Sequence, residues 1–212
     1  MLLASNHPNS FLDSVLLNTI FHQPVWSLAR GDVFKKPLYR RLLTAVKILP
    51  VYRTSEGVEN LSENYKTFDA CIELFKKNGI ITIYSEGKCI NEWHLRPLKK
   101  GTARLAIKAW DEKIPLRVLP VALNYSSFTH FGKNVFIHFG EIISPDMIGT
   151  QSADGVRNLE FNNRLRNELE KGVFEIPADE YEQLSEKLTV PVSPFKKMLL
   201  FIPGWIGWII NL

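Results

Sequence analysis

Short apolar runs alternate with stretches of helical periodicity along most of the chain. The apolar runs that predict strands lie at residues 1–5, 25–29, 49–52, 80–84, 118–124 and 135–139. Apolar residues at three- and four-residue steps predict helices at 12–21, 34–48, 59–78 and 101–110, around Phe161, Leu165 and Leu169, and at 181–188. This alternation favours an α/β fold, which we expect to be a single domain with a mixed, mostly parallel sheet flanked by helices.

The predicted helix at 59–78 has the clearest periodicity. Five apolar positions recur along one side of it: Leu61, Tyr65, Phe68, Ile72 and Phe75. We expect these five side chains to form one buried stripe.

The C-terminal residues differ from all that precede them. Residues 198–212 contain no charged residue, and Lys196 and Lys197 come directly before them. Such a run is shorter than the roughly 20 residues that span a bilayer, whereas Trp205 and Trp208 suit a membrane interface. We therefore expect a main domain at 1–175, a linker with a short helix at 176–195 and an apolar membrane-associating tail at 196–212. A segment folded onto the core and part of a longer hydrophobic region are the alternatives.

The charge distribution favours an anionic partner. The net charge is +4. Residues 30–53 contain one acidic residue, Asp32, and seven basic residues: Arg30, Lys35, Lys36, Arg40, Arg41, Lys47 and Arg53. Nucleic acid, phospholipid headgroups and a phosphorylated metabolite all fit this charge, and so does a solvated helix face. The two cysteines, Cys71 and Cys89, are too few for a disulfide framework, so we expect a reducing compartment and a cytoplasmic active site.

A histidine and a carboxylate flank the start of the first predicted helix. Asn6-His7 follows the strand at 1–5, and Asp13 lies in the first turn of the helix predicted at 12–21. A neutral imidazole can take a proton from an attacking hydroxyl, and a carboxylate on its other nitrogen fixes the tautomer. His7 and Asp13 are therefore candidate catalytic residues, although Asp13 also suits a purely structural role near a helix start.

A second polar string follows the predicted strand at 80–84. Glu86, Gly87 and Lys88 come where that strand ends, which is the edge at which open α/β folds bind ligands. Glycine permits close approach to a ligand, and Glu86 can accept a hydrogen bond from a hydroxyl group or hold a cation. A turn with a solvated glutamate is the alternative.

Together these strings resemble the motifs of the glycerolipid acyltransferase family, which includes lysophosphatidate and glycerol-3-phosphate acyltransferases. The matching segments occur in the family's order: Asn6-His7 with Asp13, residues 49–53 ending in Arg53, residues 84–87 with Glu86-Gly87, Lys99-Lys100-Gly101, and residues 118–121 with Pro120. Two positions depart from the family pattern. Five residues separate His7 from Asp13, one more than in most members, and Cys89 stands where the family usually has arginine.

The resemblance implies that His7 is a general base oriented by Asp13 and that a phosphate-bearing acceptor contacts Arg53, Glu86 and Gly87. Asn6 belongs to the same motif, Lys88 or Arg96 would replace the arginine missing at Cys89, and Lys100 adds positive charge. The implied donor is a fatty acyl thioester, either acyl-CoA or acyl carrier protein. The implied acceptor is glycerol 3-phosphate or its 1-acyl product, in phospholipid synthesis at the cytoplasmic face of a membrane.

An acyl thioester is already activated, so we expect neither a metal nor another cofactor. Membrane lipids are the expected partner and nucleic acid is not. A serine hydrolase would need a Gly-x-Ser-x-Gly elbow, which the sequence lacks. The non-enzymatic alternative is a peripheral membrane or anionic-ligand binding module, which leaves Asn6-His7 and Glu86-Gly87 unexplained.

Overall fold

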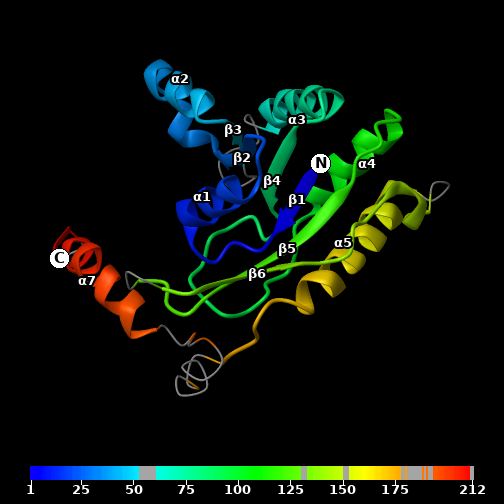
Figure 1. The fold of residues 1–212 in the computed structure, drawn as a ribbon. Coiled ribbons are helices and arrows are strands. Elements are labelled where there is room, and N and C mark those ends of the chain that lie inside the picture. Colours follow the sequence, from blue (N-terminus) through cyan, green and yellow to red (C-terminus); the bar gives the residue numbers. More distant parts are fainter. Residues whose placement is uncertain are drawn as a thin grey trace.

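The computed structural model describes residues 1–52, 61–129, 133–149, 153–177, 180, 188, 190 and 193–210 (Figure 1). Arg53 lies outside the described residues, and so does the predicted helix at 181–188 apart from Leu188.

A sheet of six strands runs through the described part of the chain, in the order β3-β2-β4-β1-β5-β6. Its strands are β1 (Leu2–Ser5), β2 (Val25–Arg30), β3 (Ile48–Val51), β4 (Ile80–Tyr84), β5 (Val118–Tyr125) and β6 (Val135–Phe139). The first five strands are parallel and β6 pairs antiparallel with β5. The predicted single α/β domain with a mixed, mostly parallel sheet is therefore confirmed.

Helices cover both faces of this sheet. The helices of the described residues are α1 (Ser10–Ile20), α2 (Pro37–Ala45), α3 (Leu61–Lys76), α4 (Lys100–Asp111), α5 (Asp154–Glu170) and α7 (Pro194–Ile210), with short 3-10 helices η1 (Gly31–Phe34) and η4 (Pro145–Met147). Alternate residues of β1 point to opposite faces: Leu2 and Ala4 pack in the larger core with α3, α4 and α5, and Leu3 packs in the smaller core with Leu17 of α1. Figure 1 shows α4 and α5 on one side of the sheet and α1 on the other.

The predicted helix at 34–48 is wrong at both ends. Pro37 begins α2, as expected of a residue whose fixed φ suits the first helical turn and whose ring blocks helix continuation. At the other end Lys47 has a φ of 64°, which breaks the helix and lets Ile48 pair with Ser27 as the first residue of β3.

The predicted stripe on α3 is correct in its C-terminal half. Ile72 and Phe75 are buried, and Phe68 is partly buried against the same core. Tyr65, however, is 71% exposed, whereas Thr67 and Cys71 are buried. The buried side of α3 therefore runs through Thr67 and Cys71, and Tyr65 lies about 200° around the helix from Thr67.

The helix α7 ends the described chain with an exposed apolar surface. Its side chains Phe195, Met198, Leu199, Phe201, Ile202 and Trp205 are all exposed. Figure 1 shows α7 on the far side of the molecule from α5. None of the helices in the described ranges is long and apolar enough to cross a bilayer.

Candidate active site

The loops that contain His7 and Glu86 lie close together because the strands before them, β1 and β4, are neighbours in the sheet. β1 and β4 pair in register, with Ser5 opposite Tyr84, so the residues that follow them leave the same edge of the sheet. Asn6 fixes the first of these loops on β5: its side-chain Nδ2 donates to the Leu123 carbonyl at 2.9 Å, and its Oδ1 accepts from the Leu123 N–H at 2.8 Å. The amide thus holds the loop in place, and its predicted substrate contact stays a prediction.

His7 and Asp13 lie in direct hydrogen-bond contact. His7 Nδ1 is 2.8 Å from Asp13 Oδ2, although five residues separate the two in the sequence. The His7 side chain is 18% exposed and the Asp13 side chain is fully buried. A carboxylate at Nδ1 requires the proton on that nitrogen, which leaves the lone pair on Nε2. The imidazole is therefore oriented as a general base, and none of the described residues hydrogen-bonds to Nε2.

The buried Asp13 carboxylate has three hydrogen-bond donors. Its Oδ2 accepts from His7 and from the Asn9 N–H at 2.9 Å, and its Oδ1 accepts from the Tyr125 hydroxyl at 2.5 Å. A buried charge needs such partners, because burial without them is costly. The sequence analysis did not identify Tyr125, which lies 112 residues from Asp13. The one feature of the sequence that could have pointed to it is its position at the end of an apolar strand.

The His7 ring lies against Tyr84. The ring centroids are 3.8 Å apart and the planes differ by 11°, so the two rings are stacked. The Tyr84 hydroxyl is 2.7 Å from Ser14 Oγ of α1. Burial raises the pKa of both Tyr84 and Tyr125, and the nearby Asp13 charge raises each further, so both hydroxyls stay protonated at neutral pH.

Glu86 joins the two loops from a buried position. Its Oε2 accepts from the His7 N–H at 2.7 Å, and its Oε1 accepts from the Arg96 N–H at 2.9 Å. The Arg96 guanidinium lies 3.3 Å from Glu86 Oε2 and 2.9 Å from Glu92 Oε1, and it also donates to the Lys88 carbonyl. Glu86 and Arg96 therefore hold the loop around His7, and their predicted contacts with substrate stay predictions.

Gly87, Lys88 and Lys100, which were also predicted to contact substrate, are exposed. Gly87 has a φ of 70°, a conformation that favours glycine. Its N–H donates to the Tyr84 carbonyl at 3.0 Å and closes a turn. The side chains of Lys88 and Lys100 are exposed. Lys100 begins α4, and the Lys99 N–H donates to the Ser85 carbonyl at 2.7 Å, which brings this basic pair to the end of β4.

Cys89 occupies the position at which the family usually has arginine. Its Sγ accepts a hydrogen bond from the Ser10 N–H at 2.9 Å, at the start of α1. Burial raises the pKa of this thiol. Cys89 therefore supplies no positive charge, and the guanidinium closest to it in the sequence is that of Arg96.

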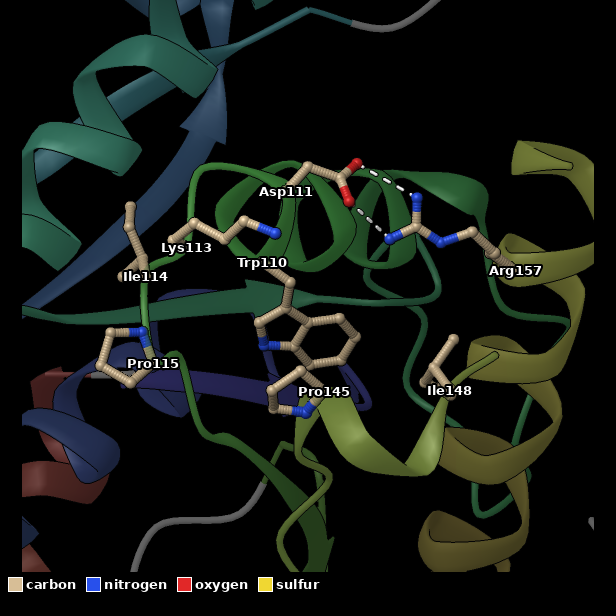
Figure 2. A pocket seen from close by; sticks show the side chains of 8 residues that line it. All are labelled: Trp110, Asp111, Lys113, Ile114, Pro115, Pro145, Ile148 and Arg157. Atoms are coloured by element: carbon tan, nitrogen blue, oxygen red, sulfur yellow. Dashed lines mark hydrogen bonds and ion pairs between the residues drawn. The ribbon is translucent and has the colours of Figure 1, made fainter. Parts of the chain in front are cut away.

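A separate pocket lies at the other end of the parallel strands from His7 and Asp13. Figure 2 shows Arg157 of α5 pointing at Asp111 of α4. The guanidinium nitrogens lie 2.6 and 3.1 Å from the carboxylate oxygens. Pro115 borders this pocket just before β5 begins, so the pocket opens at the amino ends of the parallel strands. Ligands of open α/β sheets bind at the carboxyl ends, so the His7–Asp13 edge is the better candidate site. Across the described residues no three metal-ligating side chains gather.

Comparison with known proteins agrees with this geometry. A crystal structure of PlsC, a 1-acyl-sn-glycerophosphate (LPA) acyltransferase from Thermotoga maritima, superposes with a TM-score of 0.55 and 18% identity. The match covers 84% of this chain and 66% of that one, so the chain spans slightly less than two thirds of PlsC. No curated protein matched in sequence. The model of the Acyltransferase family matches residues 1–124, which include His7, Asp13, Glu86 and Tyr84. The chain therefore belongs to the acyltransferase family.

Proposed function

We propose that this chain transfers a fatty acyl group from a thioester to a hydroxyl of a phosphorylated glycerol. The observation that supports this most directly is the 2.8 Å contact between His7 Nδ1 and the buried Asp13 carboxylate. It leaves Nε2 on a partly exposed ring, where a hydroxyl group can reach it.

In the proposed reaction His7 alone accepts the proton of the hydroxyl group and passes it to the leaving thiolate. Nε2 takes the hydroxyl proton while the hydroxyl oxygen forms a bond to the thioester carbonyl carbon. The resulting imidazolium is stabilised by the Asp13 carboxylate at Nδ1. The C–S bond then breaks, and the thiolate leaves with the proton from Nε2, so that an ester and a free thiol are formed.

The acceptor's phosphate is proposed to bind the basic groups at this edge. Lys88 and Lys100 are exposed there, and a phosphate dianion needs such cations. Arg53 is a further proposed phosphate ligand, carried over from the family motif. Gly87 lets the acceptor approach the backbone, and Glu86 and Asn6 contribute by holding the loops around it. The acceptor is glycerol 3-phosphate or its 1-acyl product, and the likeness to PlsC, an LPA acyltransferase, supports the second choice.

The donor is proposed to be acyl-CoA or acyl carrier protein. Because its thioester is already activated, His7 and correct positioning supply the chemistry that the proposal requires. General-base catalysis of this kind contributes about 10²- to 10⁴-fold in rate. The proposed place of reaction is the cytoplasmic face of a membrane; the exposed apolar side chains of α7 support contact with a membrane surface.

Thiol release from acyl-CoA or acyl carrier protein, measured with and without each acceptor, tests this proposal. We expect acceptor-dependent release by the wild-type chain and its loss in His7→Ala. The matched control is His94→Ala, because His94 also pairs with a carboxylate, at 2.5 Å from Glu175, but on the exposed surface. His94→Ala should keep the wild-type rate.

Each outcome discriminates between enzyme and binding module. Loss of turnover in a folded His7→Ala variant with normal activity in His94→Ala supports the acyltransferase. A folded wild-type chain that binds acceptor or lipid but releases no thiol from any donor would favour the non-catalytic binding module instead.

A further inference from the structure

The helix α2 adds no residue to the core, although its sequence is strongly amphipathic. Its apolar residues Leu38 and Leu42, with Val46 just after it, recur at four-residue steps, and Tyr39 lies beside them. All four side chains are exposed. The helix packs against η1 and β3, and Figure 1 shows it projecting outward beyond β3, the edge strand.

The contrast with α4 shows that this exposure is unusual within the molecule. α4 is also amphipathic and also contains several basic residues, yet its Leu105, Ile107 and Trp110 are all buried in the main core. The apolar face of α4 is therefore buried against the core, whereas the apolar face of α2 is exposed. A contiguous exposed apolar face of this kind marks an interaction surface.

The charge around α2 identifies the kind of surface that it fits. Lys35, Lys36, Arg40 and Arg41 are exposed on and just before the helix. Asp32, the one acid between residues 30 and 52, already lies 2.5 Å from Arg30. An apolar partner alone would not require these cations, whereas an anionic bilayer has both an apolar interior and negative headgroups.

We propose that α2 docks on an anionic phospholipid bilayer and lies in the plane of its headgroups. Leu38, Leu42 and Val46 then face the acyl chains, and Arg40 and Arg41 contact lipid phosphates. Helices with a basic polar face, an apolar opposite face and low overall hydrophobicity bind membranes in this way. The lipid surface is recognised by its charge together with its apolar interior.

The position of α2 relates this contact to the candidate active site. β2 ends at Arg30, and η1 and α2 follow it, so the chain enters α2 from the same sheet edge that carries His7 and Asp13. A docked α2 would hold this edge next to the lipid. The inference stands on exposure and charge, and does not depend on the proposed reaction.

Vesicle binding by the full chain tests the proposal. The vesicles contain phosphatidylcholine alone or phosphatidylcholine with phosphatidylglycerol, and we expect tighter binding to the anionic set, weakened by salt. Leu38→Ser with Leu42→Ser should lower the partition coefficient by at least about tenfold. Arg40→Gln with Arg41→Gln should lower it by about fivefold per charge, and on the anionic vesicles alone.

The control pair is Leu159→Ser with Arg164→Gln on α5. Leu159 is 62% exposed, close to the 65% of Leu38, and Arg164 is exposed, so this variant changes the same residue types elsewhere. It should bind like wild type. His7→Ala should also bind like wild type, which separates this proposal from the proposed reaction.

Because α7 also exposes apolar residues, hydrogen exchange must locate the contact. We expect anionic vesicles to protect the amides of residues 37–45. The proposal is overturned if both α2 variants bind like wild type, or if residues 37–45 gain no protection on bound vesicles. Protection of 37–45 that appears without lipid as protein concentration rises would also overturn it, since a second copy of the chain would then cover this face.

Discussion

Replacing Tyr125 by phenylalanine removes one donor from the buried Asp13 carboxylate and leaves the ring in place. The hydroxyl lies 2.5 Å from Asp13 Oδ1, and both side chains are fully buried. A hydrogen bond to a charged group contributes about 1.5–3 kcal/mol, so we expect the free energy of unfolding to fall by about that amount. For a chain of this length the corresponding decrease in Tm is about 3–12 °C.

The same variant should lose little activity. Asp13 Oδ2 still accepts from His7 Nδ1 and from the Asn9 N–H, so the imidazole keeps its orientation. We expect kcat in the thiol-release assay to fall by about tenfold or less, well short of the full general-base contribution, with KM unchanged. Urea denaturation and steady-state kinetics measure the two effects on the same preparations.

Two other tyrosines provide controls. The Tyr84 hydroxyl makes a part-buried bond to a neutral partner, Ser14 Oγ, so Tyr84→Phe should cost about 0.5–1.5 kcal/mol. Tyr65 is exposed, and Tyr65→Phe should stay within about 0.5 kcal/mol of wild type. The reasoning is refuted if Tyr125→Phe is as stable as Tyr65→Phe, or if it loses as much kcat as His7→Ala.

Three further outcomes follow from the site and its surroundings. Asp13→Asn removes the charge that stabilises the imidazolium, so kcat should fall by up to about 10⁴-fold with little change in KM; a near-normal kcat would contradict this role. Burial raises the pKa of Cys71 to about 12 and also raises that of the partly exposed Cys89, so mass spectrometry after alkylation at neutral pH should find Cys89 labelled slowly and Cys71 unlabelled until the chain unfolds. Because burial raises the pKa of Cys71 above its ordinary 9.0 and the pKa of Tyr84 and Tyr125 above 10.0, these groups ionise first in the unfolded chain; stability in urea should therefore decline as the pH rises above about 9, and above about pH 10 it should decline less steeply in Tyr125→Phe.

Local patterns were sufficient for most elements of the fold. The alternation of apolar runs and helical periodicity predicted β1, β4 and β5 to within a residue or two and also predicted α4. The errors arose where tertiary contacts decided. Periodicity predicts Ile48 to be the end of a helix, but in the structure Ile48 pairs with Ser27 and belongs to β3. Tyr65 fits an apolar stripe by spacing, but α3 is buried on the side that carries Thr67 and Cys71, and Tyr65 lies on the opposite, exposed side.

The candidate site divides in the same way. Sequence spacing was enough to single out His7 with Asp13, because both lie within one strand–loop–helix unit. It suggested substrate contacts for Glu86 and Arg96, which stay predictions, but it did not show that the Glu86 side chain accepts from the His7 N–H and pairs with the Arg96 guanidinium. Whether a polar side chain faces a ligand or its own protein depends on loop packing, which no local pattern specifies.

By itself, the sequence determined the α/β class, the order of the motifs and the acyltransferase family, since all three depend on local periodicity and on residues spaced along the chain. The tertiary structure alone decided that Asn6 is bound to Leu123 and that Tyr125 completes the shell of Asp13, over separations of 117 and 112 residues. It also decided that the apolar face of α2 is exposed while that of α4 is buried. The physical reason is that burial and hydrogen-bond partnership are set by which strands become neighbours, and that order is fixed by packing of the whole chain.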